Sequence, residues 1–306
     1  MIIDPVGTQV ARTVAAIFAD AGCAGWVHAR VIGGRASQEI DLGADHPVVM
    51  ASVYKLTLAI AFAREVDAGE IDASEQVLVD PRARQDGPTG LSLFGDPVSL
   101  TWRDLVTSMM VVSDNAAADV VLERVGLESI AAVLADAHTT HTTVVDGVRQ
   151  VHARLVTETG TSTVAEAFAV LADTDRDLQV TAYDAAYTSA TTPRDCTRLL
   201  DCLWRDVLAT PESSAWIRRL MAQQVSRSRI ASGFSVGTRV CGKTGTIGPI
   251  RNEVAVIEHP EEYPIAVAVF TRSARGDAGG PRVDVAIGAV ARAVVTALRT
   301  PRDSDG

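Results

Sequence analysis

The N-terminal part of the chain shows two kinds of hydrophobic spacing in succession. A helical spacing of apolar residues covers residues 6–21 and stops at Gly22. Two short runs with strand-like composition, 25–32 and 39–42, follow on either side of the turn signal Gly33-Gly34. These positions predict one amphipathic helix followed by a β-hairpin.

The middle of the chain has mainly helical spacing. The expected helices run from Ser52 to Gly69, from Thr101 to Ser113, and over 116–125, 128–137, 162–173, 195–208 and 213–225. Thr101 and Asp104 have the spacing of a capping box, and the valine-rich run 144–155 is expected to be extended. The C-terminal part returns to strand-like runs, at 236–246, 252–257 and 265–271, before a last helix over 283–298.

Strands at both ends and helices in the middle predict an α+β fold. The simplest arrangement is an antiparallel sheet built from the N- and C-terminal parts and covered by the two terminal helices. We expect residues 1–50 and 210–306 to form this α/β sheet domain and residues 51–209 to form an inserted helical domain. A functional pocket is expected where the two domains meet, a common position for ligand sites.

Composition limits the classes of function. The 306 residues are 47% apolar and 22% charged, as in a globular protein, and the formal net charge is -10. That charge argues against binding nucleic acid or an anionic membrane as the main activity, so a small-molecule partner and a monomer are expected. No run has the length of a membrane span, no basic leader precedes the first helix, and the four cysteines lack metal-ligand spacing. A cytoplasmic protein with free thiols and no bound metal or cofactor is the expectation.

Lysine is unusually scarce, and the two lysines mark candidate chemistry. Among 28 lysines and arginines only Lys55 and Lys243 are lysine. Lysine can act as a base at accessible pH, whereas arginine cannot. Lys55 follows Ser52 by three residues at the start of the expected helix, so both side chains share one face. A desolvated lysine there can deprotonate the serine, although the same residues are also compatible with a simple N-cap and an ordinary helical lysine.

Three short motifs occur in order along the chain. They are Ser52-x-x-Lys55, Ser113-Asp114-Asn115 and Lys243-Thr244-Gly245. In order and rough spacing they resemble the motifs of the class A β-lactamases and the related penicillin-binding proteins. Further segments also resemble this family, namely 87–91, 112–118, 191–194 and 251–256. The likeness therefore covers most of the chain and implies the β-lactamase/transpeptidase-like fold.

The resemblance implies a role for each motif residue. Ser52 would be the acylated nucleophile, Lys55 its base, and Ser113 the donor of a proton to the leaving nitrogen. Asn115 would hold an amide of the substrate, and Asp114 would be structural. Lys243, Thr244 and Gly245 would form the strand segment that binds a substrate carboxylate.

Two further sites follow from the same resemblance. The backbone N–H groups of Ser52 and Thr246 would form the oxyanion hole. Arg251, on the next strand, falls near the place where many relatives keep a carboxylate-binding arginine. The six histidines are paired with no carboxylate motif, and we expect them at surface or loop positions.

One departure from the family pattern concerns release of the acyl group. Class A β-lactamases carry a Glu-x-x-Leu-Asn run whose glutamate activates the hydrolytic water, and this sequence has no such run. The nearest substitute is Asp175, while Glu158 and Glu166 are weaker candidates. Loss of a positioned general base costs about 10² to 10⁴ in rate, so acylation is expected to be faster than release.

Three functions remain open at this point. The first is a serine hydrolase of the class A β-lactamase type that acts on a carboxylate-bearing lactam, amide or ester. The second is a cytoplasmic acyltransferase, peptidase or esterase on the same fold, in which an amine or alcohol can replace water. The third is a penicillin-binding sensor that is acylated once and stays acylated.

Overall fold

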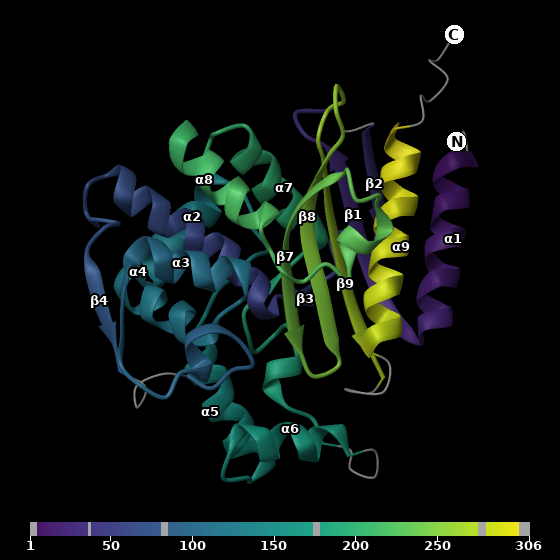
Figure 1. Ribbon diagram of the computed structural model, residues 1–306. Helices are drawn as coiled ribbons and strands as arrows, with labels where there is room; N and C mark the ends of the chain where they lie inside the picture. Colours follow the sequence, from purple (N-terminus) through teal and green to yellow (C-terminus); the bar gives the residue numbers. More distant parts are fainter. Residues whose placement is uncertain (1–4, 36–37, 81–84, 174–177, 275–279, 300–306) are drawn as a thin grey trace.

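A five-stranded antiparallel sheet lies between the two terminal helices and the other helices in the computed structural model, which describes residues 5–35, 38–80, 85–173, 178–274 and 280–299 (Figure 1). The strand order is β2-β1-β9-β8-β7, so the N-terminal hairpin joins the three C-terminal strands at β9. The strands are β1 (Cys23–Val31), β2 (Glu39–Leu42), β7 (Arg239–Ile247), β8 (Ile250–Glu258) and β9 (Ile265–Ser273). The predicted union of the two chain ends in one sheet is confirmed.

The two terminal helices cover one face of this sheet. Helix α1 (Pro5–Ala21) and helix α9 (Gly280–Arg299) lie side by side there (Figure 1). Along β8 the buried residues alternate between two cores, because successive side chains point to opposite faces of a strand. Ala255 and Ile257 pack with the terminal helices, whereas Val254 and Val256 pack with the helical part of the chain.

Helix α2 (Tyr54–Asp67) is the centre of the helical part. Every residue from Tyr54 to Ala63 is buried, as expected for a helix enclosed on all sides rather than packed along one stripe. Around it lie α3 (Trp102–Val111), α4 (Asn115–Asp136), α7 (Pro193–Trp204) and α8 (Pro211–Ala222). Lys55 is therefore buried among these helices, whereas Ser52, just before α2, is only partly buried.

Several predicted boundaries can be compared with the structure. The helices expected at 116–125 and 128–137 are confirmed as the two helical segments of α4, which are separated at Gly126 by its non-helical φ of 80°. The Thr101 hydroxyl accepts a hydrogen bond from the Asp104 N–H at 3.1 Å, which confirms the predicted cap of α3. The proposed domain boundaries at residues 50 and 210 stay a prediction.

The expectation of an extended run over 144–155 is wrong. The chain forms helix α5 (Val148–Thr159) there, followed by α6 (Val164–Ala172) close to the prediction. The segment has apolar residues at helical spacing, namely Val148, Val151 and Leu155. Its valines are β-branched and favour strands, so composition predicted the wrong element. The Asp119 carboxylate stabilises the start of α5, because it accepts hydrogen bonds from the N–H groups of Val148 and Arg149.

Short elements complete the described structure. They are β3 (Val48–Val49) paired with β6 (Ala190–Thr191), β4 (Gln76–Val79) paired with β5 (Val98–Thr101), and the 3₁₀ turns η2 (Ala51–Val53), η4 (Gly90–Leu93), η5 (Thr181–Tyr183) and η6 (Ile230–Gly233). Among all the residues that the structure describes, no helix is long and apolar enough to cross a bilayer. All four cysteines are free thiols, and Cys196 and Cys241 are buried.

Candidate active site

Ser52 lies in η2, immediately before the first turn of α2. The preceding residue, Ala51, has φ 46°, a left-handed conformation that is uncommon for a residue with a side chain. Two long-range hydrogen bonds hold the approach to this turn: Asn252 Nδ2 donates to the Val49 carbonyl at 2.8 Å, and the Met50 N–H donates to the Ser189 carbonyl at 3.0 Å. Strain of this kind persists where surrounding structure enforces it, which is common at functional sites.

Gly245 explains how the Lys243-Thr244-Gly245 strand comes close to this turn. A Cβ atom at position 245 would lie 2.6 Å from the Met50 carbonyl oxygen and 3.3 Å from the Ala51 Cβ. Only glycine leaves room for β7 and η2 to pack at this separation. The predicted third motif thus contributes its glycine to packing against the residues that carry Ser52.

The Lys55 amine is completely buried, one residue into α2. Its Nζ donates hydrogen bonds to the carbonyl oxygen of Ser113 at 2.7 Å, to the carbonyl oxygen of Asp114 at 3.3 Å and to Asn115 Oδ1 at 2.8 Å. Burial lowers the pKa of this amine to about 7, although the charges of Asp114 and Asp119 oppose the shift. Lys55 can therefore exist as the neutral base near neutral pH.

Ser113 is reached by both lysines. Lys243 Nζ donates to Ser113 Oγ at 2.9 Å and to the Thr244 carbonyl oxygen at 2.9 Å. Burial, followed by the positive charges of Lys55 and Arg229, lowers the Lys243 pKa well below its usual value. The three predicted motifs thus converge on one serine, which itself has φ 58°.

Asp114 holds the second motif in shape. Its carboxylate accepts hydrogen bonds from the N–H groups of Ala116 and Ala117, which caps α4, and from the Leu91 N–H and the Ser108 hydroxyl at 2.7 Å each. A buried carboxylate with four donors is fully engaged within the protein. This arrangement fits the structural role that the sequence suggested for Asp114.

Thr244 has a partner that the sequence analysis did not identify. Gln224 Oε1 accepts hydrogen bonds from both the Thr244 N–H at 2.7 Å and its hydroxyl at 3.1 Å. Gln224 Nε2 in turn donates to Glu253 Oε1, and burial raises the pKa of the Glu253 carboxyl to about 7. A role for Thr244 in binding a substrate carboxylate would require its hydroxyl to share or exchange this bond.

Arg251 lies opposite Thr246 in the sheet, and its role in binding a substrate carboxylate stays a prediction. Arg251 forms a two-point ion pair with Asp284 of α9, with nitrogen–oxygen distances of 2.8 and 2.7 Å. Arg229, which the sequence analysis did not select, also binds Asp284 and donates to Thr246 Oγ1 at 2.6 Å. Among many arginines nothing in the sequence distinguished Arg229, because its contact to Thr246 arises only from the fold.

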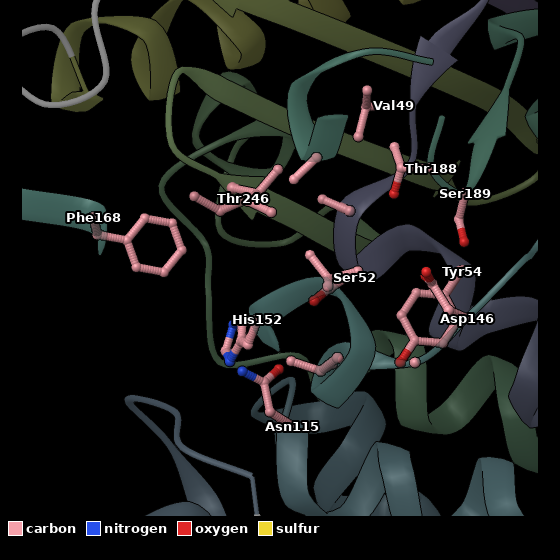
Figure 2. Close-up of a pocket in the computed structure, with 16 residues that line it drawn as sticks. Val49, Ser52, Tyr54, Asn115, Asp146, His152, Phe168, Thr188, Ser189 and Thr246 are labelled. Atoms are coloured by element: carbon pink, nitrogen blue, oxygen red, sulfur yellow. The ribbon is translucent and has the colours of Figure 1, made fainter. Parts of the chain in front are cut away.

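A pocket of about 80 Å³ opens beside Ser52. Its lining includes Asn115, Thr246 and Ser52, so one residue from each predicted motif region faces the same space (Figure 2). Ser52 and Thr246, whose N–H groups are the predicted oxyanion donors, both border it.

Helices α5 and α6 form a largely apolar wall of this pocket. Val148, Val151 and Phe168 line it, and the titratable side chains that they bring with them are Asp146 and His152. Asp146 is paired with Arg154 through one carboxylate oxygen, while its other oxygen is buried without a hydrogen bond. The Tyr54 hydroxyl, on the same pocket, is also buried without one.

Two sequence expectations are affected by this wall. Asp175, the suggested deacylation base, lies outside the described residues. The expectation that all histidines lie at the surface is wrong, because His28 is buried between the sheet and α7 and His152 is buried in the pocket wall. Because residues 144–155 were predicted to be extended, their spacing did not indicate that His152 would face a pocket. Within the described ranges no group of three histidine, cysteine or acidic side chains is arranged to hold a metal ion.

Comparison with known proteins agrees with the fold that the sequence motifs predicted. The sequence profile of the beta-lactamase enzyme family matches residues 9–298. The beta-lactamase regulatory protein BlaB of Streptomyces cacaoi is 31% identical over 278 residues, which cover 86% of this chain and 89% of BlaB.

Two solved structures illustrate the structural match. The beta-lactamase of Sphaerobacter thermophilus DSM 20745 superposes with a TM-score of 0.75 at 24% identity, covering 95% of this chain and 97% of that one. A mutant of PBP-A, solved as an acyl-enzyme complex with penicillin G, gives 0.74 at 18% identity and covers 96% of each chain. With a family profile spanning nearly its whole length and this shared fold, the chain belongs to the beta-lactamase enzyme family.

Proposed function

We propose that this protein forms a covalent acyl-enzyme at Ser52 with a carboxylate-bearing β-lactam and releases the acyl group slowly. The observation that carries the proposal is the buried Lys55 amine, with a pKa of about 7, one helical turn from a serine that borders an open pocket. A neutral amine in that position can take the serine proton.

The acylation step uses the convergence of the three motifs. Lys55 Nζ takes the proton from Ser52 Oγ, which attacks the lactam carbonyl carbon, and the N–H groups of Ser52 and Thr246 stabilise the resulting oxyanion. As the carbon–nitrogen bond breaks, Ser113 Oγ gives its proton to the leaving nitrogen and recovers the proton that Lys55 took from Ser52. Lys243, hydrogen-bonded to Ser113 Oγ, supplies positive charge. The product is an ester between the acyl group and Ser52.

Slow release is supported by the wall that α5 contributes. Val148 and Val151 occupy the pocket side of this helix, and the Asp146 carboxylate is neutralised by Arg154. A glutamate that activates water is absent from the motif positions of the sequence. Without such a base, hydrolysis of the ester is expected to be the slower half of the reaction.

A regulatory role is the second candidate, and one comparison favours it. The relative that is 31% identical bears the name of a beta-lactamase regulatory protein. A protein that is acylated and stays acylated is suited to report the presence of a β-lactam. An acyltransferase or esterase activity, in which another acceptor replaces water, would use the same Ser52 ester.

Intact-mass measurement after mixing with benzylpenicillin tests the proposal. We expect one adduct of the mass of the whole penicillin, which is absent in Ser52→Ala and persists for minutes or longer. Parallel incubation with a chromogenic cephalosporin measures turnover. No adduct and no turnover in the wild-type protein would refute the proposal, whereas rapid turnover without an adduct would refute slow release alone.

A further inference from the structure

His152 is the histidine that shares the Ser52 pocket. It lies on α5 and is buried, and its ring packs edge-on against Phe168 of α6, with the ring centres 6.1 Å apart. Its Nδ1 atom is 2.7 Å from Gln85 Nε2, so in this orientation of the amide Nδ1 accepts the hydrogen bond. In the view of Figure 2, His152 and Phe168 lie on one side of Ser52, with Asp146 and Tyr54 on the other.

The second ring nitrogen of His152 has no hydrogen-bond partner in the part of the chain that the structure describes. Among the described residues no hydrogen bond reaches Nε2, since the contact to Gln85 takes Nδ1. The ring is thus fixed at one nitrogen and available at the other, in a pocket that also holds the nucleophile. This is the arrangement that a general base requires.

We propose that His152 is the base that activates the water, or another acceptor, that releases the acyl group from Ser52. This inference rests on the proposed function, because it concerns the ester formed there. It assigns to α5 a catalytic residue for the second half of the reaction. It also makes the lifetime of the acyl-enzyme depend on the state of one imidazole.

The release step can be written with all atoms accounted for. Nε2 takes a proton from water as the water oxygen bonds to the acyl carbon of the Ser52 ester. The tetrahedral intermediate then collapses, the bond between that carbon and Ser52 Oγ breaks, and the proton held by the imidazolium passes to Oγ. The acyl group leaves as a carboxylic acid, and Ser52 is restored.

The charges around the ring favour a neutral imidazole. Burial lowers the His152 pKa below its usual value, the Asp86 carboxylate opposes this shift, and the Lys55 amine adds to it. Asp146, paired with Arg154, is the other charged group that borders the pocket from α5. At neutral pH the ring is therefore uncharged and able to accept a proton.

Gln85 determines which nitrogen accepts. Gln85 Nε2 is the amide atom beside Nδ1. A half-turn of the amide places its carbonyl oxygen there, where it accepts the Nδ1–H group and leaves the Nε2 lone pair free. An amide stabilises the imidazolium less than a carboxylate would, because it carries no charge. A Gln–His pair is therefore expected to be a weaker base than an Asp–His pair, in keeping with slow release.

Asp146 is the alternative base in this pocket, and its contacts argue against it. The ion pair with Arg154 occupies one of its carboxylate oxygens. Its remaining oxygen is enclosed, with no hydrogen bond. His152 therefore has the better combination of a fixed ring and a free nitrogen.

The test measures formation and decay of the benzylpenicillin adduct separately, by intact mass, from pH 5 to 8. In His152→Asn we expect an unchanged rate of formation and a lifetime about 10- to 100-fold longer. His141→Asn, which changes an exposed histidine outside the pocket, is the matched control and should leave both rates unchanged. Gln85→Met should also lengthen the lifetime, since it removes the partner of Nδ1.

The wild-type pH profile provides a second test that needs no variant. Release through His152 should stay level from pH 8 down to about 6.5, the usual histidine value, and slow only below it. Release through Lys55 would instead fall as the pH drops through about 7.

Each outcome bears on a different proposal. An unchanged lifetime in His152→Asn overturns the role of His152 and leaves acylation at Ser52 intact, and a longer lifetime in Asp146→Asn would then assign the base to Asp146. If His152→Asn cannot be acylated, a wild-type release rate that is flat from pH 5 to 8 overturns the inference. No adduct and no turnover in the wild-type protein refutes the acyl-enzyme itself, and with it this inference.

Discussion

Lys243 and Ser113 are joined by a hydrogen bond of 2.9 Å between residues that lie 130 positions apart. Lys243 belongs to the edge strand of the sheet, and Ser113 lies in the turn between two helices of the other part of the molecule. Lys55 binds the main chain of the same serine, so the two lysines of the sequence hold one residue from two sides. The chemistry of the site depends on how charge is shared between them.

The first prediction concerns the pH dependence of acylation. Lys55 acts as a base only when it is neutral, and its pKa is about 7. The second-order rate of acylation by benzylpenicillin should therefore be level above pH 8 and fall by about tenfold for each unit below pH 7. Stopped-flow or quenched mass measurements from pH 5 to 9 would show this. A rate independent of pH across that range would contradict the role of Lys55.

The second prediction separates the two lysines. Lys55→Arg should abolish acylation, because a guanidinium cannot take a proton at working pH. Lys243→Arg should retain measurable acylation, because a bound carboxylate needs positive charge there rather than a base. Intact mass after a fixed time with benzylpenicillin gives the comparison, and circular dichroism checks that both variants are folded. Equal loss in two folded variants would contradict this division of roles.

The third prediction tests the close approach of β7 to the Ser52 turn. Gly245→Ala places a Cβ atom 2.6 Å from the Met50 carbonyl oxygen, so the strand or the turn must move. We expect a loss of about 1 to 3 kcal/mol in the free energy of unfolding, measured with urea, and slower acylation of Ser52. Gly237→Ala is the matched control, since a Cβ there meets no atom within 4 Å. Equal effects of the two substitutions would show that packing at Gly245 is unimportant.

The fourth prediction concerns the buried Glu253 carboxyl. Its folded-state pKa of about 7 lies above the usual 4.5, so the folded protein holds this proton more tightly than the unfolded chain. The stabilisation is present below pH 4.5 and is lost as the pH rises to about 7, which amounts to about 3 kcal/mol. Glu253→Gln, which cannot ionise, should therefore gain stability relative to the wild type between pH 5 and pH 8. Parallel pH profiles of the two unfolding free energies would disprove the shift.

The sequence predicted those parts of the site that follow from local pattern. Ser52 and Lys55 lie one helical turn apart, as their spacing required, and the Thr101 cap of α3 depends on neighbours three residues away. The strand-like run at 252–257 also predicted β8. In each case the information lies within a few residues of the feature.

The remaining parts of the site depend on contacts that sequence spacing does not contain. Arg229 reaches Thr246 because Asp284 of the last helix holds it there, and no local pattern marks such an arginine. His152 faces the pocket because α5 is a helix, and its helical state depends on capping by Asp119, a residue of α4. Local propensity alone therefore predicted a strand for this valine-rich segment, which is a helix.

The hydrogen bond from Asn252 to the Val49 carbonyl has a consequence for assembly of the protein. It joins positions 203 residues apart, and it fixes the chain just before the reactive serine. Contacts at such separation form late in folding, because a long loop must close before they are gained. During refolding the chain should therefore become reactive toward penicillin only after its two ends have met in the sheet. The rate at which the penicillin adduct forms during refolding would then report the final step of folding rather than the collapse of the helices.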